Sequence, residues 1–201
     1  MNENEEIFRK ISDAANDAII TADSEGNITY WNNATVKMFG YSAEETVGKT
    51  LHRKIIPERF RDAHLNGFKK FCSTGQGAII GKTVELAAIR KDGTEFPIEL
   101  SLSGVKIKGK WNAIGIIRDI TERKIVEEKI SEVAKRYHDL FEYGNDAIFI
   151  ADSKIQNILD VNKKAEELLG YTRDEMLQKK LLDIRPKSDQ KHFKKRLRNL
   201  K

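Results

Sequence analysis

The chain has 201 residues, of which 39% are hydrophobic and 33% charged, so its composition is typical of a globular chain and excludes a disordered one. No stretch approaches the roughly 18 consecutive apolar residues of a membrane span, and the acidic start MNENEEIFRK excludes a secretory signal, so we expect a cytoplasmic protein or region. The net charge of +5 comes from residues 185–201, where eight basic residues face one aspartate; without a recognition motif this is typical of a solvated face, and we expect no nucleic-acid partner.

Two short strands open the chain. Ala18–Ala22 and Ile28–Trp31 are apolar runs on either side of SEGN, which is a hairpin turn signal. Asn32 or Asn33 can then cap a helix that Gly40 ends.

A longer helix is expected from Pro57 to about Ser73, because apolar residues recur there at helical spacing. Three strands follow, at Thr83–Arg90, Glu95–Ser103 and Trp111–Asp119, joined by short turns. Two strands, several short helices and three strands predict an α+β fold, with a five-stranded antiparallel sheet and the helices against one face.

The next segment is expected to be one helix with an apolar stripe. Its apolar residues follow a 4, 3, 4, 3 spacing, which is typical of a coiled-coil seam in a homodimer. The stripe could instead pack on its own domain, since it covers fewer than three heptads. The seam consists of Val126, Ile130, Val133, Tyr137 and Leu140.

The chain contains an internal repeat. Residues 16–24 read NDAIITADS and residues 145–153 read NDAIFIADS, an offset of 129. The second copy reaches Lys201 before its own three later strands. We therefore expect a complete domain at 1–121, a linker helix at 122–141 and the front half of a second domain at 142–201.

These motifs together resemble the PAS superfamily of the S-box type. The matching stretches are NDAIITAD with Gly26 and Ile28, WNNATVKMFGYSAEETVGK, RKDGTEFPIELSLS and the exit RDITERK. The resemblance covers about residues 5–123 as a whole domain and 137–201 as an incomplete one.

The resemblance implies a sensory input module of a histidine kinase, diguanylate cyclase or similar receptor. Such a module senses a small ligand or cofactor and passes the change to an output domain of the same polypeptide through the helix after Asp119-Ile120-Thr121. Asp119 and Thr121 are the expected signal-relay residues, since their side chains can satisfy backbone N–H groups where that helix begins. The alternative is a cofactor-free PAS domain that serves dimerisation or protein interaction.

His64 is the candidate cofactor ligand. In the haem-binding PAS domains of bacterial oxygen sensors, the histidine that binds the iron lies seven residues after a proline, and Pro57 and His64 reproduce that spacing. Phe60 and Phe68, one turn on either side, suit a porphyrin edge. The sequence departs from the pattern at Lys82 and Val84, where subfamilies have a methionine ligand and an oxygen-binding arginine. The alternative is an ordinary histidine in an empty domain.

Flavin is the second cofactor hypothesis. A photoreactive flavin domain would need a cysteine near Leu51, where there is none, although Trp31 or Trp111 could stack on a flavin ring. The single cysteine, Cys72, is interpreted as a small residue at a helix end.

The remaining histidines give no metal-ligand spacing, and we expect His52 and His192 at the surface. No nucleotide loop, catalytic triad or paired acidic metal site is visible, and Tyr137-His138-Asp139-Leu140 lacks the Arg and Pro that follow a phosphoacceptor histidine. We therefore expect no catalysis by this chain.

Overall fold

The computed structural model describes residues 3–152 and 157–190. It divides into two compact units, Met1–Val126 and Glu127–Lys201, and each is described by itself. No helix in the described ranges is long and apolar enough to cross a membrane. His192 and most of the basic tail lie outside the described residues.

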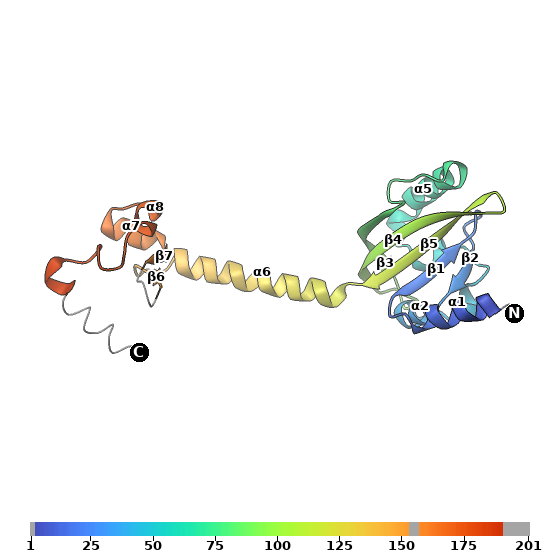
Figure 1. Ribbon diagram of the computed structural model, residues 1–201, viewed down its shortest axis with the longest axis horizontal. Coiled ribbons are helices and arrows are strands. Elements are labelled where there is room, and N and C mark those ends of the chain that lie inside the picture. Colours follow the sequence, from blue (N-terminus) through green and yellow to red (C-terminus); the bar gives the residue numbers. More distant parts are fainter. Residues whose placement is uncertain (1–2, 153–156, 191–201) are drawn as a thin grey trace. The chain divides into compact units, whose positions relative to one another are not determined.

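The first unit is built on a five-stranded antiparallel sheet (Figure 1). Its strands lie in the order β2-β1-β5-β4-β3, so the hairpin β1-β2 packs beside the last strand. The fold class expected from the sequence is confirmed. The strands are β1 (Ala18–Ala22), β2 (Ile28–Trp31), β3 (Lys82–Ile89), β4 (Glu95–Ile107) and β5 (Lys110–Asp119).

Alternate side chains of each strand face the helices and form the core. On β4, Phe96 and Ile98 are buried, whereas Pro97 between them faces the other way. Leu100 lies opposite Ile117 of β5, and Ile20 of β1 lies opposite Gly115. These neighbours pack with Trp31, Phe39 and Ile55 into one apolar cluster.

Short helices cover one face of this sheet, and both ends of α2 carry the signals expected from the sequence. Asn32 caps α2 by accepting a hydrogen bond from the Thr35 N–H, and Gly40 ends it with φ +79°. Ser42 and Glu45 form a capping box at the start of α3. The elements are α2 (Asn33–Phe39), α3 (Ala43–Thr46), α4 (His52–Ile55), the 3-10 helix η1 (Glu58–Phe60) and α5 (Arg61–Thr74).

The helix expected from Pro57 begins later than predicted. Pro57 has extended backbone, with ψ 142°, and the chain then makes the 3-10 turn η1 before α5 begins at Arg61. One further helix, α1 (Glu3–Ala14), contacts the opposite face of the sheet, where Phe8 packs on Tyr30 with ring centroids 5.1 Å apart.

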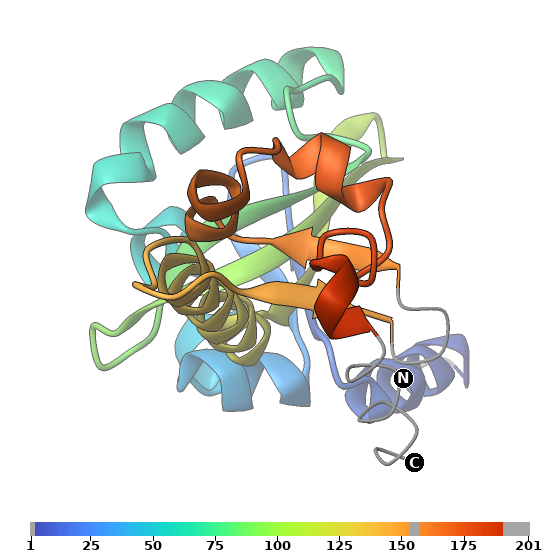
Figure 2. The ribbon, with the colours of Figure 1, turned by 90° about the vertical axis from the view of Figure 1, so that its left-hand side faces the viewer.

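The second unit repeats the front of the first. Asn162 and Gly170 bound α7 as Asn32 and Gly40 bound α2, and Thr172 with Glu175 repeats the capping box. Its two strands pair antiparallel (Figure 2), and the helix α6 (Thr121–Glu142) precedes them. The elements are β6 (Phe149–Ala151), β7 (Ile158–Val161), α7 (Lys163–Leu169) and α8 (Arg173–Leu177).

Candidate functional site

An aromatic row runs along α5 and reaches β5. His64, Phe68 and Phe71 are spaced 4 and 3 along α5, so they share one face of the helix. The ring of His64 stacks on Phe68, with centroids 6.0 Å apart and planes 12° apart. Phe68 contacts Phe71, which contacts Trp111 of β5, each with centroids 6.1 Å apart.

The C-terminal half of α5 sits close to the sheet. A Cβ on Gly104 of β4 would lie 2.6 Å from Cε2 of Phe71, and one on Gly26 would lie 3.3 Å from Cε1 of Phe68. Gly75 ends α5 with φ +73° directly against the ring of Trp111. Glycine at these places therefore lets the helix approach the strands.

His64 carries an unpaired nitrogen inside the domain. Its Nδ1 atom is buried and has no hydrogen-bond partner among the described residues. Burial, and secondly the neighbouring His52, lower the pKa of His64, so the ring is neutral at pH 7. Buried polar atoms normally have partners, and an exception calls for an explanation such as a ligand, ion or water.

His52 is not the surface histidine that we expected. It is half-buried at the start of α4, with its ring centroid 6.5 Å from that of His64. Burial is the largest cause that lowers the pKa of His52, followed by Arg53 and Arg61. The structure therefore brings together two neutral imidazoles that lie twelve positions apart in the sequence.

The other expected cofactor residues divide between the surface and the core. Phe60 is 44% exposed, with the guanidinium of Arg59 4.6 Å from its ring centroid, so it lies at the surface and not in an enclosed pocket. Trp31 is 4% exposed and packs on Phe39. Lys82 is exposed, while Val84 is half-buried on the helix-facing side of β3.

Cys72 has the surroundings of a structural thiol. Its Sγ–H donates to the carbonyl oxygen of Ser24 over 3.2 Å, which ties α5 to the β1-β2 turn. Burial, and secondly Asp23, raise the pKa of this thiol. No group of three or more potential metal ligands occurs in the described parts of the chain.

The exit from β5 is organised around Asp119. Its Oδ1 accepts hydrogen bonds from the N–H of Thr121 at 2.9 Å and from the Thr121 hydroxyl at 2.5 Å. Burial opposes ionisation of Asp119, but the hydrogen bonds from Thr121 and the charge of Arg90 outweigh it and lower the pKa. The two expected relay residues therefore lie together at the start of α6.

Sequence reasoning missed Arg90, which joins this exit to the helices. Its Nη2 atom pairs with Oδ2 of Asp119, its Nη1 donates to the carbonyl of Met38 in α2, and its guanidinium lies 3.7 Å from the centroid of Phe96. A pocket of about 430 Å³ beside this arginine is lined by α1, α2 and Asp119. In the sequence, the only sign of this role was the position of Arg90 directly before the KDG turn.

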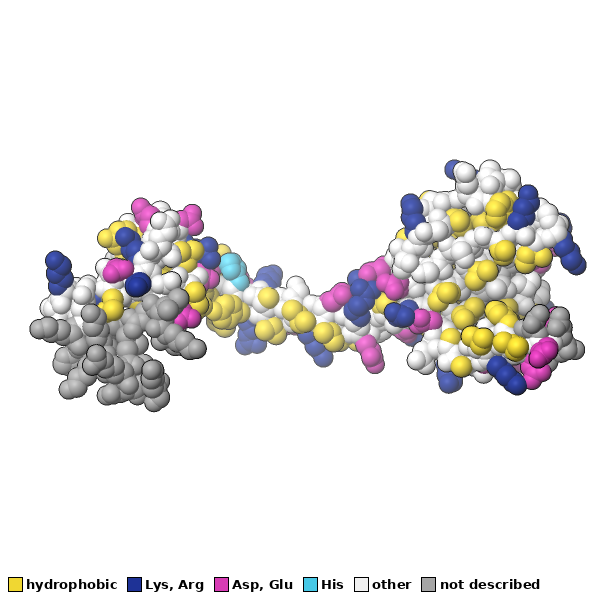
Figure 3. Space-filling model, viewed as in Figure 1, with side chains coloured by type: hydrophobic (Ala, Val, Ile, Leu, Met, Phe, Trp, Pro, Cys, Tyr) yellow, Lys and Arg dark blue, Asp and Glu magenta, His cyan; other side chains and the backbone are white. Residues whose placement is uncertain are grey.

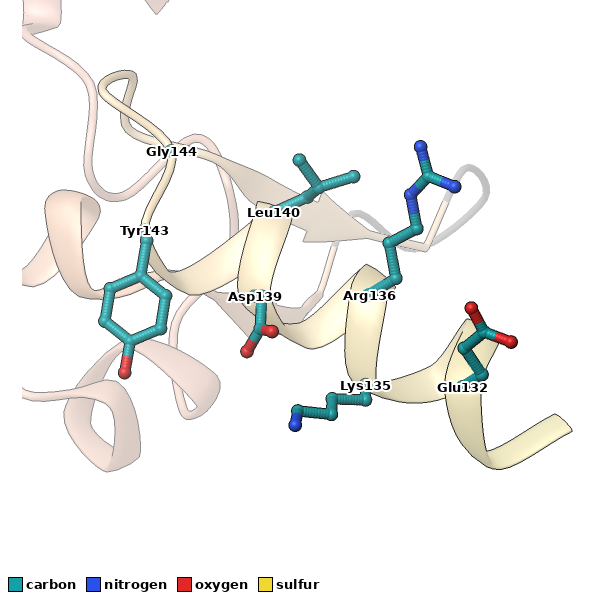
Figure 4. A pocket seen from close by; sticks show the side chains of 7 residues that line it. All are labelled: Glu132, Lys135, Arg136, Asp139, Leu140, Tyr143 and Gly144. Carbon is teal, nitrogen blue, oxygen red and sulfur yellow. The ribbon is translucent and has the colours of Figure 1, made fainter. Parts of the chain in front are cut away.

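The expected seam residues are all exposed on α6. Their exposed fractions run from 54% for Val126 to 67% for Val133 and Leu140. A shallow hollow of about 450 Å³ lies beside it, between Lys135, Arg136, Leu140 and Tyr143 (Figure 4).

Comparison with family models matches two parts of the chain. A model described as a PAS domain matches residues 16–122, and a second PAS domain model matches residues 135–200. The chain belongs to the PAS domain family. The tandem arrangement expected from the repeat is thereby confirmed, with one PAS match on each copy.

Its PAS relatives include named sensors. Sensor protein FixL of Bradyrhizobium diazoefficiens is 29% identical over 126 residues, which is 63% of this chain and 25% of that protein. Oxygen sensor protein DosP of Escherichia coli is 24% identical over 152 residues, 76% of this chain and 18% of that protein. The chain therefore spans a quarter or less of the length of these relatives. By its PAS domain matches and these relatives, it is a sensory input module of signalling proteins.

A solved structure supports the PAS fold. The crystal structure of a PAS domain from Colwellia psychrerythraea aligns with a TM-score of 0.50 and 24% identity, covering 60% of this chain and 99% of that one. At this identity the likeness shows the fold and not the ligand.

Proposed function

We propose that the first PAS domain senses a small ligand or cofactor at His64 and passes its state through Asp119 and Thr121 to α6. The observation that carries this proposal is the buried Nδ1 atom of His64, which has no hydrogen-bond partner among the described residues. An imidazole that is neutral and unpaired can donate to a ligand, accept from it or bind a metal through its lone pair.

Haem is the cofactor whose chemistry fits this donor best. When bound, it would supply an iron that takes diatomic gases, and His64 would hold that iron, with Phe68 beside the imidazole. The unpaired nitrogen and the apolar ring next to it agree with such a site. That a relative is named an oxygen sensor supports the same hypothesis.

The route to α6 begins at the aromatic row. Phe71 and Trp111 connect α5 to β5, and β5 ends at Asp119, which bonds to the first residue of α6. A ligand that moves α5 would therefore change the strand from which α6 starts. We further propose that α6 leads to an output domain of the same polypeptide, and that the chain itself performs no catalysis.

An absorption spectrum tests the proposal. The full chain is expressed with added haem, and the parent is compared with His64→Ala and with the matched control His52→Ala. We expect a Soret band in the parent and in the control, and its loss in His64→Ala. A band at about 450 nm would indicate flavin instead. The same Soret band in His64→Ala would show that another group binds the iron.

A second function is favoured by the exposed seam on α6. A row of five apolar side chains, each more than half exposed, fits a parallel partner helix from a second copy of the chain. In this alternative the PAS domain binds no cofactor and serves dimerisation. A colourless protein that remains dimeric would support this alternative.

A further inference from the structure

Four charged residues form one row across the outer face of the sheet, the face opposite α2 to α5. Glu85 of β3 lies directly opposite Glu99 of β4, and Glu99 lies directly opposite Arg118 of β5. Asp17, just before β1, completes the row, because both its carboxylate oxygens bond to Arg118 at 3.0 and 2.7 Å.

This row leaves two carboxylates side by side. Arg118 is engaged by both oxygens of Asp17, whereas Glu85 and Glu99 face each other on neighbouring strands. Like charges directly opposite each other in an antiparallel sheet are destabilising. Arg118 lies beside Glu99 but not beside Glu85, so the pair is stabilised by cations from another element.

The first turn of α6 supplies these cations. Arg123 Nη2 lies 2.8 Å from Oε1 of Glu85 and 4.0 Å from Oε2 of Glu99, and Lys124 Nζ lies 2.6 Å from Oε2 of Glu85. Acidic and basic side chains gather where α6 begins (Figure 3). Lys124, and secondly Arg123, lower the pKa of Glu85, so it is ionised at neutral pH.

The first turn of α6 holds two cations that the helix dipole disfavours, beside Glu122, which the dipole favours. Cations are unfavourable in the first turn of a helix, because the N-terminal end of the helix dipole is positive. Arg123 and Lys124 both occupy the first turn. Arg123 and Lys124 are unfavourable for the helix by itself. Their ion pairs with Glu85, which lies outside the helix, explain why they stand there.

We propose that Glu85 and Glu99 form a carboxylate seat that holds the first turn of α6 on the outer face of the sheet. The seat is separate from the Asp119 cap, which bonds to Thr121, and it anchors α6 to the edge strand β3. When α6 leaves the seat, Glu85 and Glu99 keep their mutual repulsion and lose the cations of Arg123 and Lys124. The seat is a positioning device for the signal output, and its role there rests on the proposed sensory function.

Charge reversal tests the seat without any ligand. In the full chain, the protection of the Lys124 and Ile125 amides against hydrogen exchange is measured for Glu85→Lys, Lys124→Glu and the double variant. We expect protection to fall roughly two- to five-fold in each single variant, the size of an exposed ion pair, and to recover in the double variant. A glutamate favours a helix start, so a loss in Lys124→Glu reports the lost contact with the sheet.

The matched control breaks an ion pair elsewhere. Glu95→Lys removes the exposed pair between Glu95 and Arg59, which lie 2.5 Å apart, and should leave the protection of α6 unchanged. Unchanged protection in Glu85→Lys, or no recovery in the double variant, would overturn the seat. Because no cofactor enters this experiment, its result is independent of the haem test on His64.

Discussion

The Nη2 atom of Arg90 lies 2.5 Å from Oδ2 of Asp119, and this ion pair joins the end of β5 to the C-terminal end of α2. Asp119 uses its other oxygen for Thr121, so one carboxylate holds both a helix of the sensing domain and the first residue of α6. Both side chains of the ion pair are less than one third exposed, which shields it from solvent.

Removal of the Asp119 carboxylate should weaken the domain and separate it from α6. We expect Asp119→Ala to lower the free energy of unfolding by about 1 kcal/mol through the lost cap, measured by urea denaturation. Asp119→Asn keeps an acceptor for the Thr121 N–H and should lose less. If this chain is joined to an output domain, as proposed above, Asp119→Ala should uncouple the output from the input. An unchanged output would refute the relay role.

His64 should make the stability depend on pH. The folded pKa lies below the unfolded value of about 6.5, because burial disfavours the imidazolium. As the pH falls, the unfolded chain therefore binds a proton before the folded chain does. The free energy of unfolding is highest above about pH 6.5 and decreases as the pH falls below that value. His64→Phe keeps the stacking on Phe68 and should flatten this part of the stability curve.

The control for this titration is His138→Gln, at an exposed position on α6. It should leave the difference in unfolding free energy between pH 7.5 and pH 5.5, two values on either side of about 6.5, as it is in the parent. If His64→Phe loses as much stability on acidification as the parent does, the buried imidazole is not the source.

Two glycines should respond oppositely to alanine. In Gly104→Ala the new methyl group would clash with Phe71, so we expect a loss of about 1–3 kcal/mol from overpacking. Gly67→Ala, on α5 with nothing within 4 Å of its Cβ position, should gain about 0.5–1 kcal/mol from helix propensity. Equal melting temperatures for the two variants would show that α5 does not sit against β4 as described.

The seam on α6 predicts a dimer that one charge can separate. Ile130 is 64% exposed, and a buried aspartate in its place would be unpaired in a coiled coil. Ile130→Asp should therefore sediment as a monomer at concentrations where the parent is a dimer. Ser131→Asp, one residue further and outside the seam, should remain dimeric. A parent that is monomeric at high concentration would contradict the seam itself.

The sequence predicted those features that local patterns determine. The bounds of β1 and β2, the Asn32 cap and the Gly40 stop agree with the structure, because turn and cap chemistry acts over a few residues. The apolar stripe on α6 was also visible, since helical spacing alone defines it, whereas its pairing with a second copy stays a prediction.

Features that depend on docking between elements were not predicted. Arg90 meets Asp119 across 29 positions and Arg123 meets Glu85 across 38, so each contact exists only once the sheet has formed. His52 meets His64 only because α4 packs against α5, which helical spacing within either helix does not predict. The predicted start of the long helix at Pro57 was wrong. Proline suits a first helical turn, but here the chain stays extended at that residue.

Asn32 suggests the order in which each domain folds. Its side chain accepts from the Ile19 N–H and donates to the carbonyls of Ser12 and Asp17, all within 20 positions, and Asn162 repeats the pattern with Ile148 and Asp146. The bond between Arg118 and Asp17 closes 101 positions. Short loops lose less chain entropy on closing than long ones. During synthesis, therefore, we expect the front of each domain to form while the later strands are still on the ribosome, and pulse-labelled hydrogen exchange should find the Ile19 amide protected before that of Ile116.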